Sequence, residues 1–157
     1  MRNEHQEQIR SPIATQFYGL SASTAHTDVV TNPLGRTTVL SIHNEDVTQL
    51  AFDYAFTIVT SGSTTRIESS FQLTADGIQT VINPEKPERV SNLVDLHQTA
   101  VAGECFENGT LELRFSNGSR IDVSADAHYE AWSVTRDDGE MVIAAPGGGY
   151  TRFGPRP

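Results

Sequence analysis

Residues 108–123, NGTLELRFSNGSRIDV, carry the clearest structural signal in this chain. Two Asn-Gly pairs bracket a segment in which apolar Leu111, Leu113 and Phe115 alternate with charged residues. Alternation with a period of two is typical of a β-strand that has one face on a core. Asn-Gly favours a tight turn because both residues tolerate a positive φ angle. The stretch therefore predicts consecutive β-hairpins.

The two Asn-Gly turns make different predictions about strand register. A two-residue turn at the first pair would set Phe106 opposite Leu111, and both side chains are apolar. The same turn at the second pair would set Phe115 opposite Arg120, which places an apolar and a charged side chain on one face. A three-residue loop or a bulge removes this conflict, so we expect an irregularity near Gly118.

Alternating segments also occur upstream. Residues 47–62, VTQLAFDYAFTIVTSG, place apolar and aromatic side chains on one parity, namely Leu50, Phe52, Tyr54, Phe56 and Ile58. Residues 64–73, TTRIESSFQL, repeat the alternation and predict another strand. Asp76-Gly77 predicts a hairpin turn before the short strand IQTVI at 78–82.

One segment has helical periodicity. Asn83 can cap a helix with Pro84 in its first turn, or the regular part can begin at Pro87. Four residues then repeat at helical spacing, Val90, Leu93, Val94 and His97. We expect one helix packed on the sheet, with His97 as a packed and hydrogen-bonded histidine rather than a metal ligand.

The stretch APGGGY at 145–150 could cradle a phosphate or form a turn. A phosphate-binding loop needs a helix after the glycines and, in the P-loop, a Lys followed by Ser or Thr. Here YTRF follows, which resembles an edge strand. A hairpin turn is therefore the predicted structure.

The charge balance is acidic, with 20 Asp and Glu against 11 Lys and Arg, and a net charge of -9 over 157 residues. The arginines are scattered, so the sequence argues against nucleic acid as a partner. A membrane span is excluded because no run of about 18 apolar residues occurs. The charge favours solubility, and it could also attract a basic protein partner.

Cys105 is the single cysteine, so no internal disulfide can form. A strand cysteine without neighbouring basic residues has no reason to ionise, and we expect a small core residue rather than a nucleophile. The polar N-terminus lacks an apolar segment of secretory-signal length, which predicts a cytoplasmic protein.

Candidate site residues come from the acidic and aromatic side chains. Asp53, Glu68, Asp126 and Glu130 are carboxylates that folding could bring together. Asp53 and Glu130 neighbour aromatic residues, and burial there would raise a carboxyl pKa. Tyr129 and Trp132 have opposite strand parity, so one could pack inward while the other serves as a binding anchor. The candidate binding residues are therefore Asp53, Tyr129, Glu130 and Trp132.

No metal site, cofactor or catalytic residue is predicted. The histidines lack ligand spacing, and neither a nucleophile elbow nor a cysteine pair occurs. For the organisation of the chain, we expect an N-terminal arm or tail at 1–35 and a single globular α+β domain at 36–157. The domain should be a mostly antiparallel meander of roughly seven to nine short strands with one helix packed on it.

The order of several motifs resembles a family of small, uncharacterised bacterial proteins, frequent in actinobacteria and catalogued as domain of unknown function 6188. The resemblance covers about residues 45–150 and rests on DYAF at 53–56, on residues 109–123, on YEAW at 129–132 and on PGG at 146–148. The chain departs from the family at 150–153, where YTRF replaces a frequent LAVW. The resemblance implies a bacterial source and a compact domain, and it brings no established activity.

These observations favour a non-enzymatic cytoplasmic module that binds another protein. The most specific version of this hypothesis is an immunity or antitoxin-like protein that binds a basic toxin. The alternative is a small-molecule binding domain or hydrolase whose cleft is formed by the four candidate residues. A homodimer made by pairing of edge strands is a third possibility.

Overall fold

The computed structural model describes residues 35–86 and 91–155. It contains eleven strands and the short helix α2 (Ser91–Val94). The strands are β1 (Thr38–Phe52), β2 (Phe56–Thr60), β3 (Ser63–Ile67), β4 (Phe71–Ala75), β5 (Ile78–Ile82), β6 (Ala100–Phe106), β7 (Leu111–Phe115), β8 (Arg120–Val123), β9 (Trp132–Arg136), β10 (Met141–Ala144) and β11 (Tyr150–Phe153).

All described strand pairs are antiparallel, in the order β11-β10-β9-β3-β2-β1-β6-β7-β8-β4-β5. The mostly antiparallel sheet is as predicted, but the chain has more strands than the expected seven to nine. It is also no simple meander, because β9 pairs with β3, β1 with β6, and β4 with β8. The strand count was too low because several of these strands have only four or five residues and their alternation merges across tight turns.

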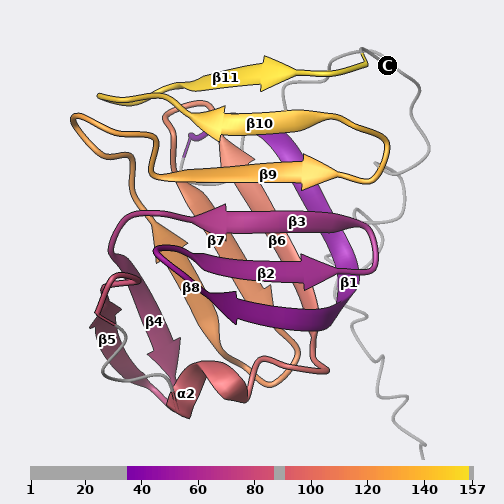
Figure 1. Cartoon of the computed structure of the whole chain (residues 1–157), viewed down its shortest axis with the longest axis vertical. Helices are drawn as coiled ribbons and strands as arrows, with labels where there is room; N and C mark the ends of the chain where they lie inside the picture. The colour runs from indigo at the N-terminus through magenta and orange to yellow at the C-terminus, as the bar shows by residue number, and fades with distance from the viewer. Residues whose placement is uncertain (1–34, 87–90, 156–157) are drawn as a thin grey trace, which may run out of the picture.

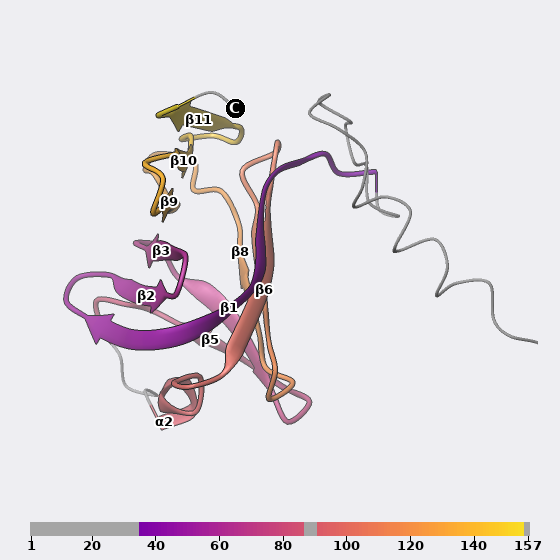
Figure 2. The same cartoon turned by 90° about the vertical axis from the view of Figure 1, so that its right-hand side faces the viewer.

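The sheet folds over into two layers that face each other (Figures 1 and 2). Strands β2, β3, β9, β10 and β11 form one layer, and β6, β7 and β8 belong to the other. The 15-residue strand β1 runs from one layer to the other, pairing with β6 over its first half and with β2 over its second half. The core lies between the layers and includes the buried side chains of Phe56, Leu113 and Trp132.

The alternation in residues 47–62 belongs to two strands. Phe52 pairs directly with Phe56 across a three-residue turn, and their rings stack with centroids 4.7 Å apart. Residues that face each other across a ladder point to the same side of the sheet, so this turn preserves the parity of the sequence pattern. Tyr54 shares that parity but lies in the turn and is exposed.

Three other hairpins share one type of three-residue turn. At each, an amide hydrogen bond closes the loop and a glycine with positive φ follows an Asn or Asp, at Gly109, Gly118 and Gly139. This geometry is a type I turn followed by a one-residue bulge. The irregularity expected near Gly118 is confirmed. The two-residue turn expected at Gly109 is wrong, because Leu111 pairs with Cys105 rather than Phe106.

The glycines of APGGGY form a hairpin turn between β10 and β11, as predicted. Ala144 pairs with Tyr150, and the amide of Ala145 donates to the carbonyl of Gly149 at 3.0 Å. Asp76-Gly77 also forms the predicted hairpin turn, which has two residues, both with positive φ angles.

The helix is shorter than predicted, with four residues in α2. Leu93 and, in the following turn, Leu96 are fully buried, whereas Val94 is exposed. The predicted apolar face is therefore wrong at Val94, because the chain continues after α2 in tighter turns, with the Leu96 amide bonded to the Leu93 carbonyl, and Leu93 and Leu96 share the buried side. His97 lies on the surface, with its Nε2 atom 3.2 Å from the carbonyl oxygen of Thr48.

The expected N-terminal arm and Val90 lie outside the described residues. Within the described ranges, no helix has the length and apolar character that crossing a bilayer requires.

Gly109 and Gly118 allow a matched test of the contact between the turn at Gly109 and the β10–β11 turn. Both have φ near +90° in the same kind of turn, so a side chain at either position costs about 1–2 kcal/mol of backbone strain. A Cβ at Gly118 meets nothing within 4 Å, but at Gly109 it would lie 2.8 Å from the carbonyl oxygen of Gly149. We expect Gly109→Ala to lower the free energy of unfolding by about 3 kcal/mol or more and Gly118→Ala by about 1 kcal/mol. Urea denaturation measures the free energy of unfolding of both variants. Equal losses would contradict the close contact between the Gly109 turn and the β10–β11 turn.

Candidate functional site

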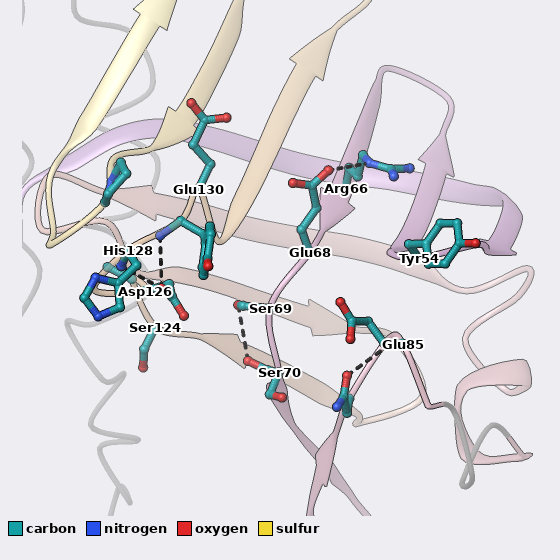
Figure 3. Close-up of a pocket in the computed structure, with 14 residues that line it drawn as sticks. Tyr54, Arg66, Glu68, Ser69, Ser70, Glu85, Ser124, Asp126, His128 and Glu130 are labelled. Carbon is teal, nitrogen blue, oxygen red and sulfur yellow. Dashed lines mark hydrogen bonds and ion pairs between the residues drawn. The ribbon is translucent and has the colours of Figure 1, made fainter.

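A surface hollow of about 1030 Å³ lies where the connections at one end of the molecule converge (Figure 3). The β3–β4 and β8–β9 connections and the segment after β5 supply most of its wall, and the turns at Tyr54 and Pro146 complete it. The described lining residues are Tyr54, Arg66, Glu68, Ser69, Ser70, Asn83, Glu85, Ser124, Ala125, Asp126, His128, Tyr129, Glu130 and Pro146.

The β8–β9 connection, residues 124–131, is held in place by hydrogen bonds at Asp126. Its Oδ1 atom accepts the amides of His128 at 2.8 Å and Tyr129 at 3.0 Å. Its carbonyl oxygen accepts the amide of Gly147 at 2.7 Å, which ties the connection to the β10–β11 turn. At the other end, the carbonyl of Ala131 accepts the amide of Glu68 at 2.9 Å. These bonds fix the wall of the hollow without a helix or strand.

The hollow is acidic. Among the lining residues that the structure describes, there are four carboxylates, those of Glu68, Glu85, Asp126 and Glu130, and one guanidinium, that of Arg66. Arg66 is itself paired, 2.8 Å from Glu68 and 3.3 Å from Asp53. The positive charge is therefore already engaged, and the surface presents an excess of negative charge to solvent.

The four candidate binding residues do not form one cleft. Tyr129 and Glu130 line the hollow, and both are exposed. Asp53 lies beside it through its ion pair with Arg66. Trp132 is 1% exposed and donates its indole N–H to the carbonyl of Gly109 at 2.8 Å, so it is a core residue rather than a ligand contact.

The carboxylates considered from the sequence mostly share one hollow, whereas the aromatic candidates Tyr129 and Trp132 do not. Three of the four acids considered from the sequence, Glu68, Asp126 and Glu130, line the same hollow. Tyr54 and Glu85 were missed as site residues. Each follows a strand by only a few positions, and no local pattern in the sequence indicates that these two connections meet.

Two carboxyl groups at the hollow, those of Asp126 and Asp53, have pKa values below their ordinary value. The pKa of Asp126 is lowered from its ordinary value by the backbone amides of His128 and Tyr129. The pKa of Asp53 is lowered by the amide of Ala55 and by the Arg66 guanidinium. Both groups stay ionised at neutral pH, whereas a general acid needs the opposite shift.

Cys105, the single cysteine of the chain, is buried in the core. Burial raises the pKa of the Cys105 thiol far above its ordinary range, which keeps it protonated. Among residues 35–86 and 91–155, no group of three His, Cys, Asp or Glu side chains could hold a metal ion.

Asp126→Ala tests whether this carboxylate orders the wall. The folded-state pKa is lowered, so the stabilisation is present above the ordinary pKa of 3.8 and is lost as the pH falls through the folded value. We expect the variant to melt at a lower temperature than the wild type at pH 7, and the difference to shrink at lower pH. Thermal melts as a function of pH measure this. Glu130→Ala, in the same connection, is the control, and a pH-independent difference for Asp126→Ala would contradict the mechanism.

The comparisons with known proteins identify a family and nothing more specific. Neither the curated proteins nor the solved structures contain a match to this chain. A family model described as a family of unknown function, DUF6188, matches residues 38–154. The matched range runs from the start of β1 to the end of β11, so it includes the whole described sheet and the hollow. The chain belongs to the DUF6188 family.

Proposed function

We propose that this domain is a non-enzymatic binding module for a basic segment of another protein, and that the acidic hollow receives that segment. The observation that carries the proposal is the excess of carboxylates around an open depression flanked by two exposed tyrosines. Tyr54 is 82% exposed and Tyr129 is 73% exposed. Large exposed tyrosines are frequent anchors in protein interfaces, because they contribute contact area and a hydroxyl at low entropic cost.

The lining of the hollow favours a protein segment over a small molecule. Small-molecule pockets are mainly apolar and enclose most of the ligand surface. Here charged and hydroxyl side chains predominate, such as Glu85, Ser69 and Ser124. Lysine and arginine side chains are long enough to reach separate carboxylates, so a basic segment fits this chemistry better than a compact ligand.

Binding and inhibition of a basic toxin, as by an immunity or antitoxin-like protein, is one role that would use such a surface. Complementary charge raises the rate of encounter and selects a partner of the opposite sign. The cytoplasmic location and the bacterial source stay predictions, and they accord with this role.

A charge-reversal pair tests the proposal with a hexa-arginine peptide as the probe. Glu85→Lys with Glu130→Lys changes two lining residues. Asp46→Lys with Asp137→Lys makes the same change in net charge at exposed positions near the β2–β3 and β9–β10 turns, at the opposite end of the layer (Figure 1). At low ionic strength we expect the first pair to weaken peptide binding by about tenfold and the second pair by much less.

Isothermal titration calorimetry measures both affinities, and added salt should weaken binding to the wild type. Equal losses in the two double variants would mean that only the overall charge matters, and the hollow would not be the site.

A further inference from the structure

The edge strand β5 has no charged residue and exposes apolar side chains, unlike the acidic hollow. Among the described residues it pairs only with β4, so its outer backbone groups have no strand partner. It lies at the border of the sheet (Figure 1). Ile78 is 67% exposed and Val81 is 72% exposed. No residue from 77 to 84 is charged, in a chain whose net charge is -9.

The opposite edge, β11, carries the protection that sheets usually place at an edge. Arg152 occupies its centre, with its Nε atom 3.3 Å from Glu140 and its guanidinium donating to the carbonyl of Val39. Gly154 with positive φ and Pro155 follow directly. Charge and proline both discourage the addition of a strand, and β5 has neither within its length.

The turn that precedes β5 determines which backbone groups point outward. Ala75 pairs with Ile78 across the two-residue turn. Residues that flank such a turn exchange both hydrogen bonds, and the pattern then alternates along the ladder. Ile78, Thr80 and Ile82 therefore direct their amides and carbonyls to β4, while Gln79 and Val81 direct theirs outward.

We propose that β5 pairs antiparallel with β5 of a second copy of this chain, about a two-fold axis at Thr80. In this register Gln79 lies opposite Val81 of the second copy and exchanges hydrogen bonds with it, and the reverse pair does the same. Thr80 lies opposite its own equivalent in a pair without hydrogen bonds. On one face of the joined sheet, the exposed Ile78 lies opposite Ile82 of the second copy, whose side chain is buried in its own core.

The charge distribution selects a second copy as the occupant. Two chains of net charge -9 repel each other, so they can approach only where like charges do not meet. The strand Ile78–Ile82 meets that requirement, since every pair of the proposed register within it joins two uncharged side chains. A basic partner would gain nothing from this edge. The pairing is short, so the dimer is weak and reversible rather than obligate.

Sedimentation velocity across a range of micromolar concentrations tests the dimer. We expect the wild type to shift from monomer to dimer as its concentration rises, and more readily with added salt, which screens the repulsion. Binding of a basic peptide at the hollow should weaken with salt, so the two proposals give opposite salt dependences and can fail separately. Val81→Lys should stay monomeric at every concentration. Thr151→Lys, at the exposed edge β11, is the matched control and should dimerise like the wild type. Circular dichroism and thermal melts confirm that both variants fold.

Cysteine cross-linking then tests the register. Across a pair without hydrogen bonds the Cα atoms lie about 4.5 Å apart, within the range of a disulfide. Thr80→Cys should therefore form a covalent dimer under mild oxidation. Ile78→Cys should not, because its equivalent would be offset by about 14 Å along the strand. The native Cys105 is fully buried and does not contribute. A wild type that stays monomeric, a Val81→Lys variant that still dimerises, or equal cross-linking of the two cysteine variants would overturn the proposal.

Discussion

The 15 residues of β1 do not pair along their whole length with one neighbour, and this constraint sets the arrangement of the other strands. The register with β6 shifts between Ile42 and Glu45, where Asn44 has a φ of 50°. A bulge of this kind bends a strand and increases its twist. After the bulge, Glu45 and Asp46 still pair with β6, and β1 then pairs with β2 from Val47 onward. The result is two facing layers around one core instead of a flat open sheet.

Local hydrogen bonds stabilise the point at which β1 changes its pairing from β6 to β2. The Glu45 carboxylate accepts the hydroxyl of Ser63 at 2.6 Å and also that of Thr60, so the bulge is tied to the β2–β3 turn. Gly62 lies against the same carboxylate, where a Cβ would come within 2.9 Å of its oxygen. On the other side, the amide of Val47 donates to the carbonyl of Thr99 just before β6. A polar cluster therefore positions the strand that joins both halves of the hydrophobic core.

The hollow is formed by the connections between strands at one end of the two layers. The buried indole of Trp132 anchors the start of β9 to the Gly109 turn, which leaves Tyr129 and Glu130 outside the core on a connection that Asp126 holds. The same end of the molecule collects Glu68 and Glu85 from two other connections. Acidic groups gather there, while β5 stays free of charge. The two surfaces thus differ in charge, which is why we propose a basic partner for the hollow and a second copy of the chain for the edge strand.

The sequence by itself determined the local features of this protein. Asn-Gly and Asp-Gly pairs marked the turns because few other residues tolerate positive φ, and alternation marked the strands because their side chains project to opposite faces. Only the tertiary structure decided that β9 lies beside β3 and β4 beside β8, because pairing between distant segments depends on how the whole core is filled. It also decided that Trp132 is buried and Tyr129 exposed, and that the carboxylates of Glu68, Asp126 and Glu130 share one hollow. Those placements come from long-range packing, which no short window of sequence contains.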